Sequence, residues 1–205
     1  MSQIVLTTDT LGTTTAGALE YASPVIYGTP VGNQRGVIPN AQFFRLDTNL
    51  VGANVNTVQS VFGVSVSLSA STVYAFEAMY YFNKTAGATS HTLGIGYGGS
   101  ATLNSILWNS VGIDGSATLP TRSTPGLAAS AAVTNQTITG ATASAAATTF
   151  ANIKGIVSVN AAGTFTPQYT LSAAPGGAYS TMANSYFLIY PIGVSGANTN
   201  VGTWA

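Results

Sequence analysis

The sequence contains very little charge. Only 5% of its 205 residues are Asp, Glu, Lys or Arg, whereas a typical globular domain has about 25%. The five acidic and five basic residues leave a formal net charge of zero. Such a balance gives no electrostatic attraction for nucleic acid, an anionic membrane or a strongly charged substrate. We therefore expect neither nucleic acid nor membrane among the partners.

Cysteine is absent altogether, which excludes disulfides and thiolate metal sites. Long hydrophobic runs are also missing, since no stretch approaches the 18 or so apolar residues of a membrane-spanning helix. The start, MSQIVLTTDT, lacks the basic region and following apolar stretch of a signal peptide. We expect neither a membrane span nor export by the usual route.

Apolar residues are present in an ordinary amount, at 46%, and Thr, Ser, Asn, Ala and Gly replace the missing charge. Obligate protein interfaces are depleted in Lys, Glu and Asp. The composition therefore favours a surface covered by other subunits of a homo-oligomer or a larger particle. The alternative is a β protein of extracellular type with a surface rich in Thr and Ser.

Alternation of apolar and polar residues with period two dominates the chain and predicts strands. At 59–70 the apolar positions run from Phe62 to Leu68, and at 72–82 both faces of the strand are apolar apart from Glu77. Further strands are expected at 90–97, 102–109, 131–138, 152–159, 164–171 and 185–192, separated by Gly, Pro, Asn or Ser clusters. Eight strands at this spacing predict an all-β fold, a jelly-roll-like antiparallel β-sandwich.

The first fifty residues differ from the rest, because short strands alternate there with Gly and Pro. Residues 1–11 are predicted to form an extended arm and 17–29 a hairpin. We therefore expect two regions: an N-terminal arm and β-hairpin attachment region at 1–50, and the jelly-roll-like sandwich at 51–205. The stretch 112–150 has low complexity and predicts weak strands and long loops.

Residues suited to catalysis are scarce. His91 is the one histidine, and it is interpreted as a hydrogen-bonded residue at a strand end rather than a catalytic base. Five carboxylates in the whole chain make an acid–base pair improbable, and Glu77 is expected to pair with Lys84 or Arg45. No cluster has metal-ligand spacing. We expect no catalytic, cofactor-binding or metal-binding residues, and so no enzyme.

Two features suggest contacts with other subunits. The strand at 185–192 has two apolar faces, one of which carries Phe187 and Ile189. A strand of this kind needs a partner on each face, so both residues are predicted to lie at a subunit interface. Trp204, next to the end of the sequence, is expected to fill a groove in its own sandwich or at a subunit boundary.

Three stretches of the chain resemble modules of tailed-bacteriophage virion proteins. They begin with TTTAGALEYASPVIYG (13–46), VFGVSVSLSASTVYAFEAMYYF (61–104) and IKGIVSVNAAGTFTPQYT (153–205). The resemblance covers most of the chain, and 112–150 departs from it most. It implies a trimeric β-sandwich at the particle surface of a virion, made in the bacterial host cytoplasm, and it carries over no catalytic residues.

Two functions fit this resemblance. A capsid decoration (cement) protein binds the outer shell of the head as a homotrimer, whereas a tail-fibre tip recognises a host surface glycan or protein. Only about fifty residues precede the sandwich and no shaft repeat is present, which favours decoration. The arm, through Ile4, Val5 and Leu6, is then expected to add a strand to a sheet edge of the major capsid protein.

Overall fold

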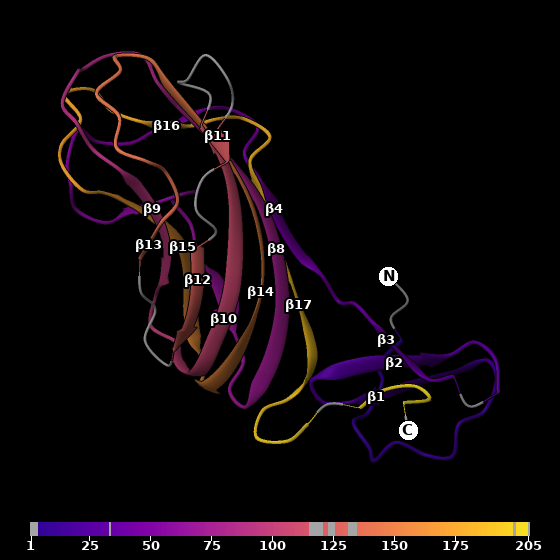
Figure 1. The fold of residues 1–205 in the computed structure, drawn as a ribbon. Coiled ribbons are helices and arrows are strands. Elements are labelled where there is room, and N and C mark those ends of the chain that lie inside the picture. The colour runs from indigo at the N-terminus through magenta and orange to yellow at the C-terminus, as the bar shows by residue number, and fades with distance from the viewer. Residues whose placement is uncertain are drawn as a thin grey trace.

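The chain forms an all-β structure, as predicted. The computed structural model describes residues 4–32, 34–114, 121–122, 126–130, 135–198 and 200–204. Within these ranges every regular element is a strand, and the named strands pair antiparallel. Figure 1 shows a tall sandwich and a small unit beside its lower end, which contains β1, β2 and β3.

The larger sheet of the sandwich is built on three long strands whose alternating side chains can bury one whole face. Its central order is β10 (Thr102–Asp114), β14 (Ala147–Ala161), β8 (Thr72–Lys84), β17 (Tyr186–Val194) and β4 (Gln42–Arg45). Shorter strands extend it: β11 (Thr121–Arg122) and β12 (Gly126–Ser130) on β10, β16 (Ser180–Thr181) on β8, and β5 (Leu50–Val51) on β16.

The facing sheet is smaller. It contains β13 (Gln136–Thr137), β9 (Leu93–Gly98) and β15 (Gly163–Leu171), with β6 (Gln59–Ser60) and β7 (Val66–Leu68) on two parts of β15. The single strand predicted at 59–70 is therefore wrong. The chain pairs at its two ends and leaves the ladder between them, where Val64 is exposed.

The topology is that of a jelly roll with one strand moved. Eight strands taken in chain order are β4, β7, β8, β9, β10, β14, β15 and β17. A jelly roll places them in two sheets ordered 1-8-3-6 and 2-7-4-5. Here the sheets are ordered 1-8-3-6-5 and 2-7-4, because the fifth strand, β10, pairs with β14 instead of β9. The predicted sandwich class is confirmed.

The core lies between the two sheets and is rich in aromatic rings. The predicted inward face of β8 is confirmed, since Tyr74, Phe76, Ala78, Tyr80 and Phe82 are all buried. Phe76 stacks on Phe187 at a centroid distance of 5.6 Å. Gly155 of β14 is paired with Phe76 of β8, and a Cβ atom at Gly155 would overlap the Phe76 ring. The packing therefore requires a glycine at this position of β14.

The N-terminal unit is a separate three-stranded sheet of β1 (Ala18–Ala22), β2 (Val25–Thr29) and β3 (Gly36–Ile38). Its first two strands are the predicted hairpin. The boundary expected at residue 50 lies earlier, because β4 and β5 belong to the large sheet. The tail after β17 returns to this unit, where a cleft of about 290 Å³ is lined by Tyr27 and Arg35 together with Ala197, Asn198, Asn200, Val201 and Gly202.

Candidate attachment surfaces: a groove, an arm and an apolar sheet face

A groove opens between the two sheets along one side of the sandwich. Its borders are β4 and the segment 64–67, which includes the start of β7. Within the described residues, β4 pairs with β17 alone and β7 with β15 alone, so each has one unpaired edge. The groove encloses about 370 Å³. Edges of this kind present free N–H and C=O groups that can accept another strand.

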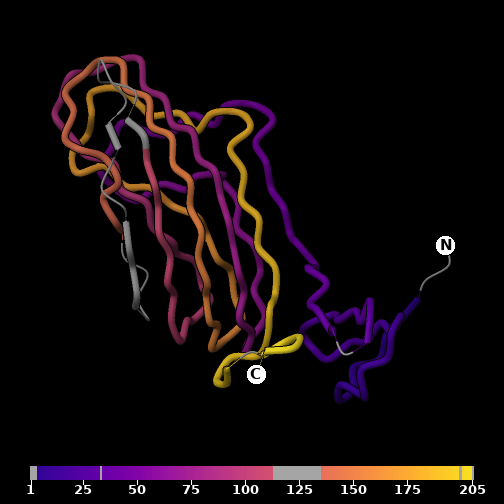
Figure 2. Tube along the Cα trace, turned by 45° about the vertical axis from the view of Figure 1, so that its right-hand side comes forward, coloured from indigo at the N-terminus to yellow at the C-terminus, as the bar shows by residue number. Residues whose placement is uncertain are grey.

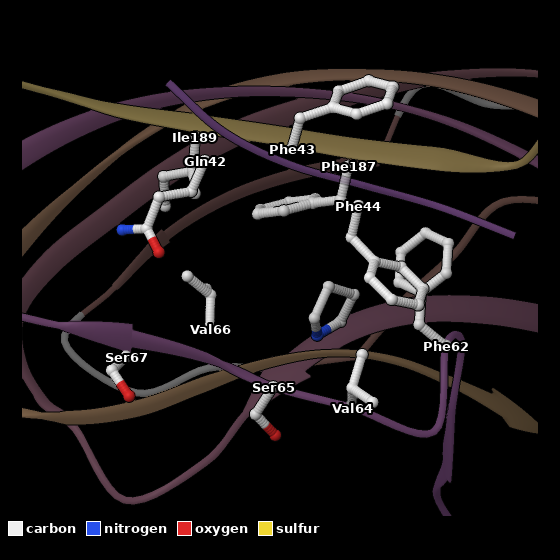
Figure 3. A pocket seen from close by; sticks show the side chains of 11 residues that line it. Gln42, Phe43, Phe44, Phe62, Val64, Ser65, Val66, Ser67, Phe187 and Ile189 are labelled. Atoms are coloured by element: carbon white, nitrogen blue, oxygen red, sulfur yellow. The ribbon is translucent and has the colours of Figure 1, made fainter. Parts of the chain in front are cut away.

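The lining of the groove is apolar with a polar rim. Figure 3 shows Phe44 and Phe62 at one end, Val66 across from β4, and Phe187 and Ile189 behind them. Phe44 packs edge-on against Phe62 at 5.4 Å between ring centroids, yet it remains partly open to solvent. The rim is formed by the uncharged polar side chains of Gln42, Ser65 and Ser67. The core is thus reachable from this side.

The predicted arm is exposed. Ile4 and Val5 are 90% and 75% exposed, and Leu6 is half-buried. The arm is held at its base, where the Ser23 N–H donates to Thr8 Oγ1 (2.9 Å) and the Asp9 N–H donates to the Tyr21 carbonyl (3.1 Å). Figure 2 shows it leaving the small sheet on the side remote from the sandwich. The described residues form no regular strand there.

The small sheet has a second exposed apolar surface, its outward face. Leu19 and Ile38 are 54% and 42% exposed there, with Gly28 between them. The inward face, with Val25 and Tyr27, is buried. We call the surface of Leu19, Gly28, Gly36 and Ile38 the outward face below.

An ion pair ties the segment before β1 to this sheet. The Glu20 carboxylate and the Arg35 guanidinium lie 2.8 Å apart. The same carboxylate accepts from the Gly12 N–H (3.0 Å), and Arg35 Nη2 donates to the Gly12 carbonyl (2.6 Å). Both side chains are largely buried. The pair therefore fixes Gly12 to this unit without help from the sandwich.

The residues Phe187 and Ile189, predicted at a subunit interface, lie in the core of their own chain instead. Phe187 is only 4% exposed and Ile189 is fully buried, both inside the core of their own chain. The prediction chose the wrong face of β17, since it is Leu188 and Tyr190 that point away from the core. Both faces are apolar, so the sequence alone did not distinguish inward from outward.

Trp204 does not fill a groove in its own chain. Its side chain is 80% exposed. The backbone is tied locally, because Asn200 Nδ2 donates to the Trp204 carbonyl at 3.2 Å. Of the two positions expected for this residue, only the subunit boundary stays a prediction.

His91 has the structural role that the sequence indicated. The buried ring lies between the Thr89 carbonyl, 2.8 Å from Nδ1, and the Tyr179 hydroxyl, 2.8 Å from Nε2. Because a carbonyl can only accept, Nδ1 carries a proton and donates to Thr89, and in the neutral ring Nε2 accepts from the hydroxyl. The main chain of His91 exchanges hydrogen bonds with Thr142. The ring therefore joins segments at the upper end of the sandwich.

The partners predicted for Glu77 are wrong. Lys84 is buried, and its ammonium donates to the carbonyls of Ala86 (3.0 Å), Gly87 (2.7 Å) and Ser144 (2.7 Å). Burial lowers the pKa of Lys84. Arg45 instead pairs with Asp47 at 2.7 Å.

Glu77 faces outward on the large sheet, opposite Lys154 in the ladder. The register between β8 and β14 places Glu77 opposite Lys154. The sequence did not reveal this pairing, because the two strands are far apart along the chain.

In the part of the chain that the structure describes, no three His, Asp or Glu side chains gather as metal ligands would. The same residues include no helix of the length and hydrophobicity needed to cross a membrane.

The groove is not predicted by any pattern in the sequence. The sequence feature that points to the groove is the pair Phe43–Phe44 in the four-residue strand β4. The pair puts an aromatic ring on each face of this strand, and all four residues of the strand are exposed. The pattern alone did not reveal that β4 and β7, on opposite sheets, border one opening.

Comparison with known proteins gives little guidance. No family model matches the chain, and no curated protein matches it. Among solved structures, the chain is similar to "Structure of infectious bursal disease virus Gx strain" at 7% identity and a TM-score of 0.19. The match covers 88% of this chain and about half, 51%, of that one. A likeness this weak carries no argument about function.

Proposed function

We propose that the protein is a non-enzymatic structural protein of a tailed-bacteriophage particle. In this proposal it is a homotrimeric capsid decoration protein that binds the major capsid protein at the outer surface of the head. The sequence resemblance supports the particle, and the architecture supports the mode of attachment. The N-terminal unit would bind the shell, and the sandwich would stand above it.

The observation that carries this proposal is the outward face of the small sheet. Two large apolar side chains, Leu19 and Ile38, are exposed on the outward face of a sheet only three strands wide. Full burial of such a side chain stabilises a contact by roughly 1.5–3 kcal/mol. Three copies of the face, held in one trimer, would bind together with a high effective concentration. A weak single contact can thus become tight attachment.

The lack of charge supports the same function. A decoration protein is in permanent contact with neighbouring subunits, and such contacts are depleted in Lys, Glu and Asp. This chain has ten such charges, counting Arg, in 205 residues. Two of them, Glu20 and Arg35, are used inside the N-terminal unit.

Localisation on purified virions tests the proposal. Cryo-microscopy or immunogold labelling should place the protein over the whole head, at a copy number close to that of the major capsid protein. Labelling confined to the tail tip would contradict decoration and would indicate the receptor-binding function, with a host surface glycan or protein as partner.

Substitution tests the attachment face directly. The double variant Leu19→Asp, Ile38→Asp should lose binding to purified undecorated heads while its sandwich unfolds at the same temperature as the wild type. Val58→Asp is the matched control, because Val58 is equally exposed but lies on the sandwich side of the chain. Normal head occupancy by the double variant would rule out this face.

A further inference from the structure

We propose that the arm of one copy occupies the groove of a neighbouring copy. In this arrangement residues 4–8 form an added strand beside β4 or β7 of the next subunit. The inference rests on the proposed homotrimer and names what holds it together. It assigns the arm to a second copy of this chain instead of the capsid protein.

The arm has the properties of a donated strand. Residues 3–8, QIVLTT, are uncharged and rich in β-branched residues, which favour extended structure. In an extended segment Ile4 and Leu6 share one face, and Val5 lies on the other. Ile4 is almost wholly exposed in the single chain. An apolar segment in this state gains free energy from any partner that buries it.

The groove has the properties of an acceptor. Unpaired strand edges border it on both sides, so an added strand can form main-chain hydrogen bonds with either sheet. Its interior is lined by Phe44, Val66 and Phe187, against which apolar side chains can pack. The rim is uncharged, as is the arm. The groove and the arm therefore match in chemistry, and the unpaired edges of the groove can pair with an extended arm.

The position of the arm favours a second copy over its own groove. Hydrogen bonds at Thr8 and Asp9 fix the base of the arm to the small sheet, and the arm extends from the side remote from the sandwich. A donor and a different acceptor on each copy make a head-to-tail contact, which closes into a ring when the rotation allows. In a closed trimer each arm fills one groove and pairs with one of its two unpaired strand edges.

Cross-linking tests this exchange, because the chain has no cysteine of its own. Two chains would be co-expressed, one carrying Leu6→Cys and the other, with a tag, carrying Val66→Cys. After oxidation we expect a disulfide that joins the two different chains. Ile4→Cys replaces Leu6→Cys in a second pair, which covers both inward positions of the arm. Val58→Cys in place of Val66→Cys is the control and should give no such product.

Two outcomes would overturn the inference. The first is cross-linking of neither arm position above the Val58→Cys control. The second is a disulfide formed only within one chain when Leu6→Cys and Val66→Cys are combined, which would mean that each arm occupies its own groove.

Association measurements give an independent test. The variant Ile4→Asp, Leu6→Asp should weaken self-association at least tenfold by analytical ultracentrifugation, without a change in the thermal unfolding of the sandwich. Val5→Asp, on the other face of the arm, should weaken it less. An unchanged association constant for the double variant would contradict arm exchange.

The test separates this inference from the proposed function. A wild-type protein that binds heads as a monomer would overturn arm exchange and leave attachment intact. A trimer with exchanged arms that does not bind heads would overturn the proposed attachment and leave arm exchange intact.

Discussion

The sandwich and the N-terminal unit bury their apolar residues in different ways. In the sandwich two sheets cover each other, and rings from both meet in the core, such as Phe76 and Tyr97 at 5.2 Å. In the N-terminal unit the returning tail lies against the inward face of the single sheet, and the outward face of that sheet is exposed. The sandwich buries most of its apolar residues within one chain and is open only at the groove between β4 and β7, whereas the small unit leaves one whole sheet face exposed.

The difference follows from size. A sheet must bury one face against a second layer, and strands of three to five residues offer little area for this. The unit compensates with the Glu20–Arg35 pair and the tail. If the comparison holds, core substitutions should unfold the sandwich, and changes in the small unit should stay local.

The largest effect is expected from Phe187→Asp. It places a carboxylate in the core and should lower the free energy of unfolding by more than about 4 kcal/mol. Leu188→Asp, on the outward face of the same strand, is the control and should cost far less. Chemical denaturation measures both. Equal losses for the two variants would mean that β17 does not divide core from surface.

Alkaline pH should destabilise the sandwich more than the small unit. Burial raises the pKa of Tyr169 to about 12, while the unfolded value is about 10. The stabilisation from the neutral hydroxyl is therefore complete below pH 10 and is lost as the pH rises through 12. This amounts to about 2–3 kcal/mol. Tyr169→Phe should flatten the fall in unfolding free energy between pH 10 and 12.

Tyr27→Phe gives the counterpart in the N-terminal unit. Burial raises the pKa of Tyr27, but the Arg35 charge opposes the shift. Its effect on the alkaline slope should be smaller than that of Tyr169→Phe, and a larger one would reverse the comparison.

Glu20→Gln should loosen the small unit alone. Loss of the largely buried ion pair with Arg35 is expected to cost about 1–2 kcal/mol locally. Hydrogen exchange should quicken at the amides of Asp9 and Gly17, which bond to β1 and β2, and stay unchanged in β8. Asp47→Asn is the control, because its pair with Arg45 is exposed and worth about 0–1 kcal/mol. Faster exchange in β8 would show that the two regions are coupled.

The smallest effect is expected from Ser110→Ala. Its hydroxyl is buried and has no hydrogen-bond partner among the described residues, so its removal should change stability by about 0 to +1 kcal/mol. Ser185→Ala is the matched control, because the Tyr81 N–H donates to that equally buried hydroxyl at 3.0 Å. It should cost about 1 kcal/mol. A loss for Ser110→Ala equal to that of Ser185→Ala would indicate an additional partner for Ser110.

Much of the fold was predictable because period-two alternation is a local property. It gave β8 with its inward residues from Tyr74 to Phe82, as well as β15 and the hairpin of β1 and β2. Alternation failed where both faces of a strand are apolar, as at Phe187 and Leu188, because the pattern then does not tell which face points to the core. It also failed for β6 and β7, where the strand is interrupted.

The candidate attachment surfaces were predictable only in part. The arm was identified from its sequence, because a β-prone apolar segment before a Pro-rich region has no partner nearby. The outward face and the groove were not, since each combines strands whose pairing depends on distant segments. Lys84 illustrates the same limit, because three main-chain carbonyls hold it in place of a carboxylate.

By itself the sequence determined the all-β class, the inward face of β8 and the near absence of charge, because each follows from residue type and local spacing. The tertiary structure decided the rest: the inward face of β17, the place of β4 in the sandwich and the opening between β4 and β7. These depend on register and strand order, which are set by contacts between residues more than a hundred positions apart, such as Phe44 and Phe187.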